Sequence, residues 1–113
     1  MSMNITEEKT GTVAILKPAG RIDSATAGEF EKRLVAAVGA GSRIVVDMAQ
    51  LGYISSAGLR ALLVAAKKAR PAGGRIALAA MSPPIREVFD LSGFSSLFEI
   101  YPDGPAAVAA LAA

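Results

Sequence analysis

Residues 43–60 of the chain read RIVVDMAQLGYISSAGLR, and this stretch decides the fold class. Its first five residues form a short apolar run bounded by turn signals, which is typical of a parallel strand buried on both faces. Residues 48–54 are expected to form a loop, and apolar periodicity predicts a helix over about residues 56–72. A buried strand followed by a helix is half of a βαβ unit, so the stretch predicts an α/β domain.

The sequence on both sides of this stretch continues the alternation of strands and helices. Strands are predicted over residues 3–8, 12–16 (resuming at 21–22), 75–80 and 97–101. Helices are predicted at residues 27–38, after Ser82, and over residues 106–113, with Asp23, Ser24 or Thr26 as the cap of the first of them. This order predicts βαβ units in a mixed, largely parallel sheet of about 4–5 strands with about 4 helices. We expect one domain over residues 1–113.

The composition narrows the possible functions. The 113 residues are 52% hydrophobic and 19% charged, which is typical of one globular domain. The chain has no Cys and no His, which excludes thiol nucleophiles, disulfides, classical zinc sites and Ser-His-Asp triads. The net charge is only +2 and no basic stripe is visible, so direct nucleic-acid binding is not expected. No apolar run reaches the length of a membrane span, and residues 1–10 are too polar for a signal peptide, so we expect a cytoplasmic protein.

Four small residues, 55–58, occupy the expected start of the second helix. Ser56 is predicted as the N-cap, where its hydroxyl accepts a backbone N–H bond. Ala57 and Gly58 leave the backbone uncovered, so that another surface can approach closely. A phosphate on Ser56 would be tolerated by the positive end of the helix, yet it would disrupt an apolar or acidic partner surface. The simpler interpretation is that Ser55 and Ser56 only cap the helix.

Several segments together resemble the STAS domains of the anti-sigma factor antagonist (anti-anti-sigma factor) family, over about residues 3–111. The segments that carry the resemblance are Gly20-Arg21-Ile22-Asp23, Ile44-Val45-Val46-Asp47, Tyr53-Ile54-Ser55-Ser56-Ala57-Gly58-Leu59-Arg60, residues 81–89 and Leu91-Ser92-Gly93. The resemblance implies a sheet with helices packed mainly on one side. It also implies no catalysis. No metal cluster is apparent in the sequence, and we expect neither a metal nor a cofactor.

The family resemblance also implies a regulatory cycle. Members bind a serine-kinase anti-sigma factor and so free a sigma factor; the kinase phosphorylates one serine, the complex separates, and a PP2C-type phosphatase resets it. Matching the Gly-Leu pair of the motif places that serine at Ser56. The family often has Asp before this serine and Ser or Thr after it, whereas this chain has Ser55 and Ala57. Ser55 is therefore the alternative phosphorylation site.

Other residues near the motif are candidates for partner contact. Asp23 matches an acidic position of the family, and its loop is expected to lie near Ser56; it contacts the partner or shapes the phosphate-bearing loop, caps the first helix, or does both. Arg60 is expected on the exposed side of the second helix, where it could meet an acidic partner. Asp47 is expected to fix its loop by accepting backbone N–H bonds. The predicted partner-binding residues are Asp23, Ser24, Ser55, Ala57, Gly58 and Arg60.

Two other functions remain open from the sequence. STAS-like domains also resemble subunits of transport or sensory complexes, in which this chain would be a static adaptor without a phosphorylation switch. A nucleotide phosphate could bind at the start of the helix at Ser56, which the anion preference of helix N-termini supports only in general terms. A monomer is expected, because no separate apolar interface stripe stands out.

Overall fold

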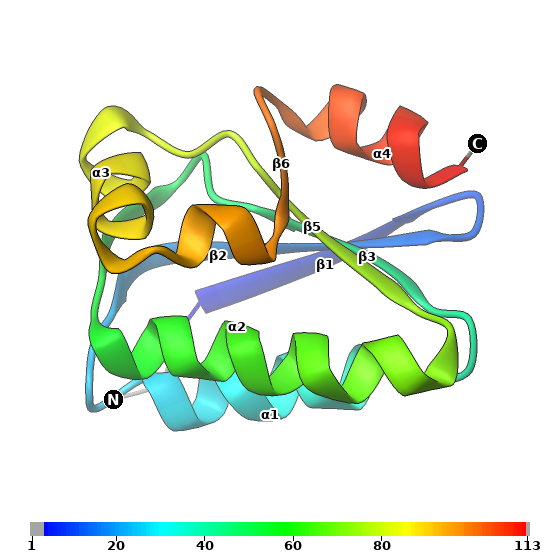
Figure 1. Cartoon of the computed structure of the whole chain (residues 1–113), viewed down its shortest axis with the longest axis horizontal. Helices are drawn as coiled ribbons and strands as arrows, with labels where there is room; N and C mark the ends of the chain where they lie inside the picture. Colours follow the sequence, from blue (N-terminus) through cyan, green and yellow to red (C-terminus); the bar gives the residue numbers. More distant parts are fainter. Residues whose placement is uncertain (1–3, 113) are drawn as a thin grey trace.

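The predicted alternation of strands and helices is present in the computed structural model, which describes residues 4–112. The strands are β1 (Asn4–Thr10), β2 (Val13–Ile22), β3 (Arg43–Asp47), β4 (Leu51–Ile54), β5 (Arg75–Ala79) and β6 (Glu99–Tyr101). The helices are α1 (Ala27–Ala37), α2 (Ser56–Ala69), α3 (Pro83–Ser92) and α4 (Gly104–Ala112) (Figure 1). Met3 and Ala113, which the sequence analysis assigns to the first strand and the last helix, lie outside the described residues.

One mixed sheet organises the molecule, with strand order β1-β2-β3-β5-β6. β1 runs antiparallel to β2, and the pairs β2–β3, β3–β5 and β5–β6 are parallel. Besides β1, β2 pairs with two further strands: residues 13–16 pair with β3, and residues 20–22 pair with β4. The register shifts between Gly20 and Arg21, and Gly20 has φ of +89°, a value that glycine adopts readily. The predicted mixed, largely parallel sheet is therefore confirmed.

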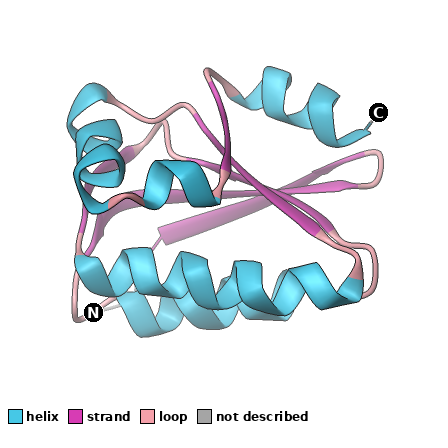
Figure 2. Cartoon of the chain, viewed as in Figure 1, coloured by secondary structure: helices cyan, strands magenta, loops and turns pink. Residues whose placement is uncertain are grey.

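The helices cover the two faces of the sheet unequally (Figure 2). α1, α2 and α3 share one core with the sheet, in which Phe30, Leu62 and Phe89 are fully buried. α4 covers the opposite face, where Ala107 and Leu111 pack against residues of β2, β3 and β5. This arrangement agrees with the expected packing of helices mainly on one side.

β4 is a strand in the segment for which the sequence predicts a loop. Leu51 and Ile54 are 4% and 2% exposed, because both side chains point into the main core. The two residues between them, Gly52 and Tyr53, are exposed. Four residues including a glycine give a weak strand signal, and pairing with β2 supplies the stabilisation that local preference lacks.

Candidate functional site

The parallel pairing of β2 with β4 brings two candidate segments to the same end of the sheet. Ile22 and Ile54 are paired at the carboxyl ends of their strands. The backbone N–H of Ser55 donates a hydrogen bond of 2.8 Å to the carbonyl of Ile22. Asp23 directly follows Ile22, so this bond joins the turn after β2 to the start of α2. Crevices outside the carboxyl ends of strands are the usual location of binding sites in α/β folds.

The two serines at the start of α2 have different surroundings. Ser55 is half-buried and is the N-cap, because its Oγ accepts a hydrogen bond of 3.3 Å from the backbone N–H of Gly58. Ser56 is the first residue of the helix, and its side chain is exposed. The expectation that Ser56 is the cap was wrong by one residue. The Ser56 hydroxyl makes no hydrogen bond with any residue in the range 4–112.

Gly58 has an internal reason to be glycine. It is buried, and a Cβ at this position would lie 2.7 Å from both Ile22 Cγ2 and Ile54 Cγ1. α2 therefore starts in direct contact with the ends of β2 and β4, and only glycine allows this approach. Ala57 is half-buried and packs against the main core. The sequence predicts an uncovered backbone at Ala57 and Gly58, but side chains of the core cover most of it. Ser56 is the exposed residue of residues 55–58.

The turn after β2 is built around the carboxylate of Asp23. Its Oδ1 accepts hydrogen bonds from the backbone N–H groups of Ala25 at 3.0 Å and Thr26 at 3.2 Å. These bonds, that from Ala25 foremost, hold the pKa of Asp23 below its ordinary value. α1 begins at Ala27, and Thr26, at its N-cap position, makes no side-chain capping bond. Asp23 thus fixes the turn and remains ionised beside the start of α2.

An arginine and a tyrosine that the sequence analysis did not select form a cation–π pair at this end of the sheet. The guanidinium carbon of Arg21 lies 4.2 Å from the centroid of the Tyr53 ring. The two residues are register partners on β2 and β4, and Tyr53 is 40% exposed. Ser24, in the turn after β2, and Arg60, on α2, are also exposed. Only recognition of β4 as a strand could have shown the pairing of Arg21 with Tyr53 beforehand.

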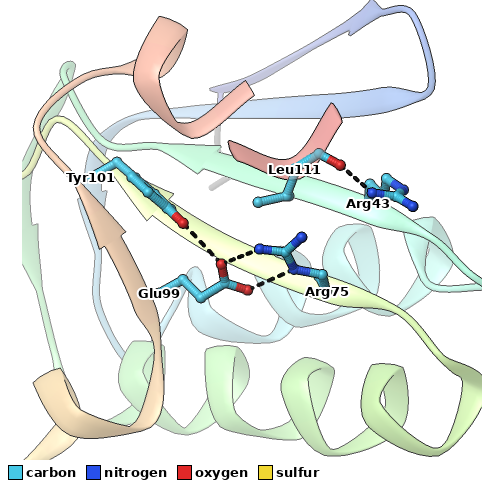
Figure 3. A network of polar contacts seen from close by, with 5 residues as sticks. All are labelled: Arg43, Arg75, Glu99, Tyr101 and Leu111. Carbon is cyan, nitrogen blue, oxygen red and sulfur yellow. Dashed lines mark hydrogen bonds and ion pairs between the residues drawn. The ribbon is translucent and has the colours of Figure 1, made fainter. Parts of the chain in front are cut away.

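A second polar cluster lies at the opposite edge of the sheet, on β5 and β6 (Figure 3). Arg75 forms a bidentate ion pair with Glu99, with Nε 3.0 Å from Oε2, and the Tyr101 hydroxyl donates to Glu99 Oε1 at 3.0 Å. The Arg75 guanidinium holds the pKa of Glu99 below its ordinary value. Arg43 donates to the carbonyl of Leu111, which attaches α4 to β3. These contacts link neighbouring elements, so we assign them a structural role.

No group of three acidic, Cys or His side chains that could hold a metal ion occurs within residues 4–112. Asp47 accepts a hydrogen bond of 3.0 Å from the N–H of Ala49, as predicted, and so fixes its own loop. None of the helices described is both long and apolar enough to cross a membrane.

The mixed sheet, its helices and the serine at the start of α2 define a STAS domain, and residues 4–107 match that family. The chain is 41% identical over 109 residues to BtrV of Bordetella bronchiseptica, whose name describes it as an anti-sigma factor antagonist. This match covers 96% of this chain and 94% of BtrV. The chain therefore belongs to the STAS-domain family of anti-sigma factor antagonists.

Solved structures share the fold at lower identity. A Thermotoga maritima protein described as an anti-sigma factor antagonist superposes with a TM-score of 0.87 at 18% identity, covering 96% of this chain and 95% of that chain. SpoIIAA of Bacillus, solved in a phosphorylated form, superposes with a TM-score of 0.72 at 20% identity, covering 96% and 99% of the two chains. At these identities the likeness shows a common fold.

Proposed function

We propose that this chain is an anti-sigma factor antagonist whose unphosphorylated form binds a serine-kinase anti-sigma factor and thereby frees a sigma factor. Phosphorylation of Ser56 by that kinase separates the complex, and a PP2C-type phosphatase restores the unmodified form. The 41% identity to BtrV, with its name, supports the binding role. SpoIIAA, which has the same fold, has been solved in a phosphorylated form, and this supports a phosphorylation switch.

Ser56 is preferred to Ser55 as the phosphorylated residue because the two side chains differ in exposure and in hydrogen bonding. Ser56 is exposed at the first position of α2, and its hydroxyl makes no hydrogen bond within residues 4–112. The Ser55 hydroxyl already accepts the N–H of Gly58, and modification there would have to replace the cap of α2. A kinase can therefore reach Ser56 without disturbing the fold, which makes Ser55 the less favourable site.

The charge around Ser56 explains how phosphorylation would release a partner. Arg21 and Arg60 are exposed cations at this end of the molecule, and the carboxylate of Asp23 is bound within its own turn. A partner surface with carboxylates would complement them. A phosphate adds about −1.5 to −2 charges at pH 7, which would face those carboxylates as a like charge.

The exposed candidates Ser24, Ser56 and Arg60 are the direct contact residues in this proposal. Asp23, Ser55, Ala57 and Gly58 are half-buried or buried, and they shape the surface that the contact residues share. The proposed cycle takes place in the cytoplasm between a monomer of this chain and its protein partners. It involves no cofactor, no catalysis by this chain and no direct contact with nucleic acid.

The test is a quantitative pull-down from lysate of the source cell with four baits: wild type, Ser56→Asp, Ser56→Ala and Ser96→Asp. The Ser96→Asp variant adds the same charge at an exposed position on the 3-10 turn before β6. We expect wild type and Ser96→Asp to capture a kinase-like anti-sigma factor that Ser56→Asp loses. Ser56→Ala should retain that factor even when ATP is added.

Equal capture by wild type and Ser56→Asp would contradict the switch. Capture of a transport or sensory complex by all baits would instead favour the static adaptor. Mass spectrometry of the chain purified from its cells, mapping phosphate to Ser56 or Ser55, decides between the two serines independently of any binding assay.

A further inference from the structure

We infer that Arg60 binds the phosphate of modified Ser56, so that phosphorylation occupies the cation that the unmodified protein offers to its partner. The inference rests on the proposed function for two points, the choice of Ser56 as the modified residue and the contact of Arg60 with the partner. It adds a role for Arg60 within the chain itself. The guanidinium would act as an internal clamp for the phosphate.

The spacing of the two residues along α2 allows this contact. Ser56 is the first residue of the helix and Arg60 follows four residues later, on the next turn. Side chains at this spacing lie on one face of a helix, with Cβ atoms about 5–6 Å apart. An acidic group preceding a basic group by four residues is also the more favourable order. Both side chains are exposed, so neither has to leave the core to meet the other.

Arg60 is available for this contact. Among the arginines within residues 4–112, Arg60 alone makes no ion pair, hydrogen bond or cation–π contact. The others contact a carboxylate, a carbonyl oxygen or an aromatic ring: Arg21, Arg33, Arg43, Arg70, Arg75 and Arg86. A phosphate on Ser56 would therefore not have to displace an existing ion pair in order to bind Arg60.

The first turn of α2 supplies no anion of its own in the unmodified protein. This turn contains no acidic residue, although the N-terminus of a helix favours negative charge. Asp23 is the acid on the adjoining turn, and its Oδ1 is bound to the N–H groups of Ala25 and Thr26. A phosphate on Ser56 would meet both the helix N-terminus and the free guanidinium of Arg60.

Two effects on the partner surface follow from the clamp. Phosphorylation adds negative charge, and it also withdraws Arg60 from carboxylates on the partner. The modified domain becomes more stable, because the new charge interacts with the helix end and with Arg60. Release of the partner and stabilisation of the free domain would thus result from the same contact.

The experiment uses the full chain with phosphoserine incorporated at position 56 during translation, so that it depends on no kinase. The melting temperature is measured for modified and unmodified forms of wild type, Arg60→Gln, Arg60→Lys and Lys68→Gln. Lys68 is an exposed residue near the other end of α2 and serves as the matched control. We expect phosphorylation to raise the melting temperature of wild type and Lys68→Gln by roughly 3–6 °C. The rise should fall to half or less in Arg60→Gln and be partly retained in Arg60→Lys.

A second measurement separates the clamp from a merely structural role of Arg60. The second pKa of the phosphate, about 6 for a free phosphoserine, is followed by phosphorus NMR. Besides Arg60, charged residues lie at the end of β2 (Arg21 and Asp23), on α1, which packs against α2 (Glu29, Glu31, Lys32 and Arg33), and on α3, which packs against β4 (Arg86, Glu87 and Asp90); none of them is changed. We expect a higher phosphate pKa in Arg60→Gln than in wild type or Lys68→Gln.

An equal rise in melting temperature and an equal phosphate pKa in Arg60→Gln and wild type would overturn the clamp. That result would leave the proposed function intact, because partner release by Ser56 phosphorylation is measured by the pull-down. Conversely, a clamp present in a chain that releases no partner would overturn the proposed switch alone.

Discussion

At the scale of single residues, the start of α2 is determined by packing as much as by chemistry. Gly58 allows the helix to touch the ends of β2 and β4, and Ser55 caps it. Ser56 is left as the exposed hydroxyl between these two structural residues. A site with this construction can change its charge without changing its backbone, since the residues on both sides of Ser56 hold the helix in place.

Replacement of Gly58 by alanine tests this packing. The added methyl would lie 2.7 Å from side-chain atoms of Ile22 and Ile54, so those side chains or α2 itself must move. We expect a loss of about 1–3 kcal/mol in the free energy of unfolding, measured by urea denaturation. Gly28→Ala is the control, because a Cβ there meets no atom within 4 Å and the residue is exposed. Equal stability of the two variants would contradict the packing argument.

The sequence predicts the residues of the candidate site better than their roles. Ser56 and Asp23 follow from the motif and from the family resemblance, and the structure brings their segments together through the bond between Ser55 and Ile22. The internal role of Gly58 and the Arg21–Tyr53 pair could not be predicted. Both depend on the register of β2 against β4, and strand pairing between segments about 30 residues apart has no local signal.

At the scale of elements, the sequence predicts the helices and strands that have a strong local pattern and misses the strand whose pattern is weak. The periodic helices and the buried strands β3 and β5 lie close to their expected positions. β4 is too short to show a strand pattern, and only its pairing with β2 defines it. α4 consists largely of alanine and small apolar residues, so its sequence predicts a helix without indicating which face of the sheet it covers.

A substitution in α4 measures how much the second face of the sheet contributes. Leu111 is fully buried against β2, β3 and β5, so Leu111→Ala should leave a cavity. We expect a loss of about 2–4 kcal/mol in the free energy of unfolding, with little change in partner binding because α2 lies on the other face. The control is Leu91→Ala, since Leu91 is 81% exposed. A loss below about 1 kcal/mol for Leu111→Ala would mean that α4 is only loosely attached.

At the scale of the whole molecule, stability should change with pH in acid but not near neutrality. The chain has no histidine or cysteine to titrate near neutrality. Hydrogen bonds and ion pairs lower the pKa values of Asp23, Asp90 and Glu99 in the folded state. A lowered folded pKa contributes stability that is complete above the unfolded value, 3.8 for Asp and 4.5 for Glu, and is lost as the pH falls through the folded value.

We therefore expect the urea midpoint to be nearly constant between pH 6 and pH 8 and to fall progressively below about pH 4.5. In acid, the urea midpoint of Asp23→Asn should fall less than that of wild type, because this variant lacks one of the three carboxylates whose pKa is lowered in the folded state. Glu87→Gln, which removes an exposed carboxylate from α3, is the control. A steep change near pH 7 would show that a different group governs stability.

The edges of the sheet have a consequence for how the protein behaves when no partner is bound. β1 forms one edge and exposes the charged residues Glu7, Glu8 and Lys9, and β6 at the other edge is only three residues long. Charged or very short edge strands are poor templates for adding a strand from another chain. The sheet thus discourages the aggregation to which open sheets are prone. In the cycle proposed above the protein is without a partner for part of the time, and this resistance would protect it during that interval.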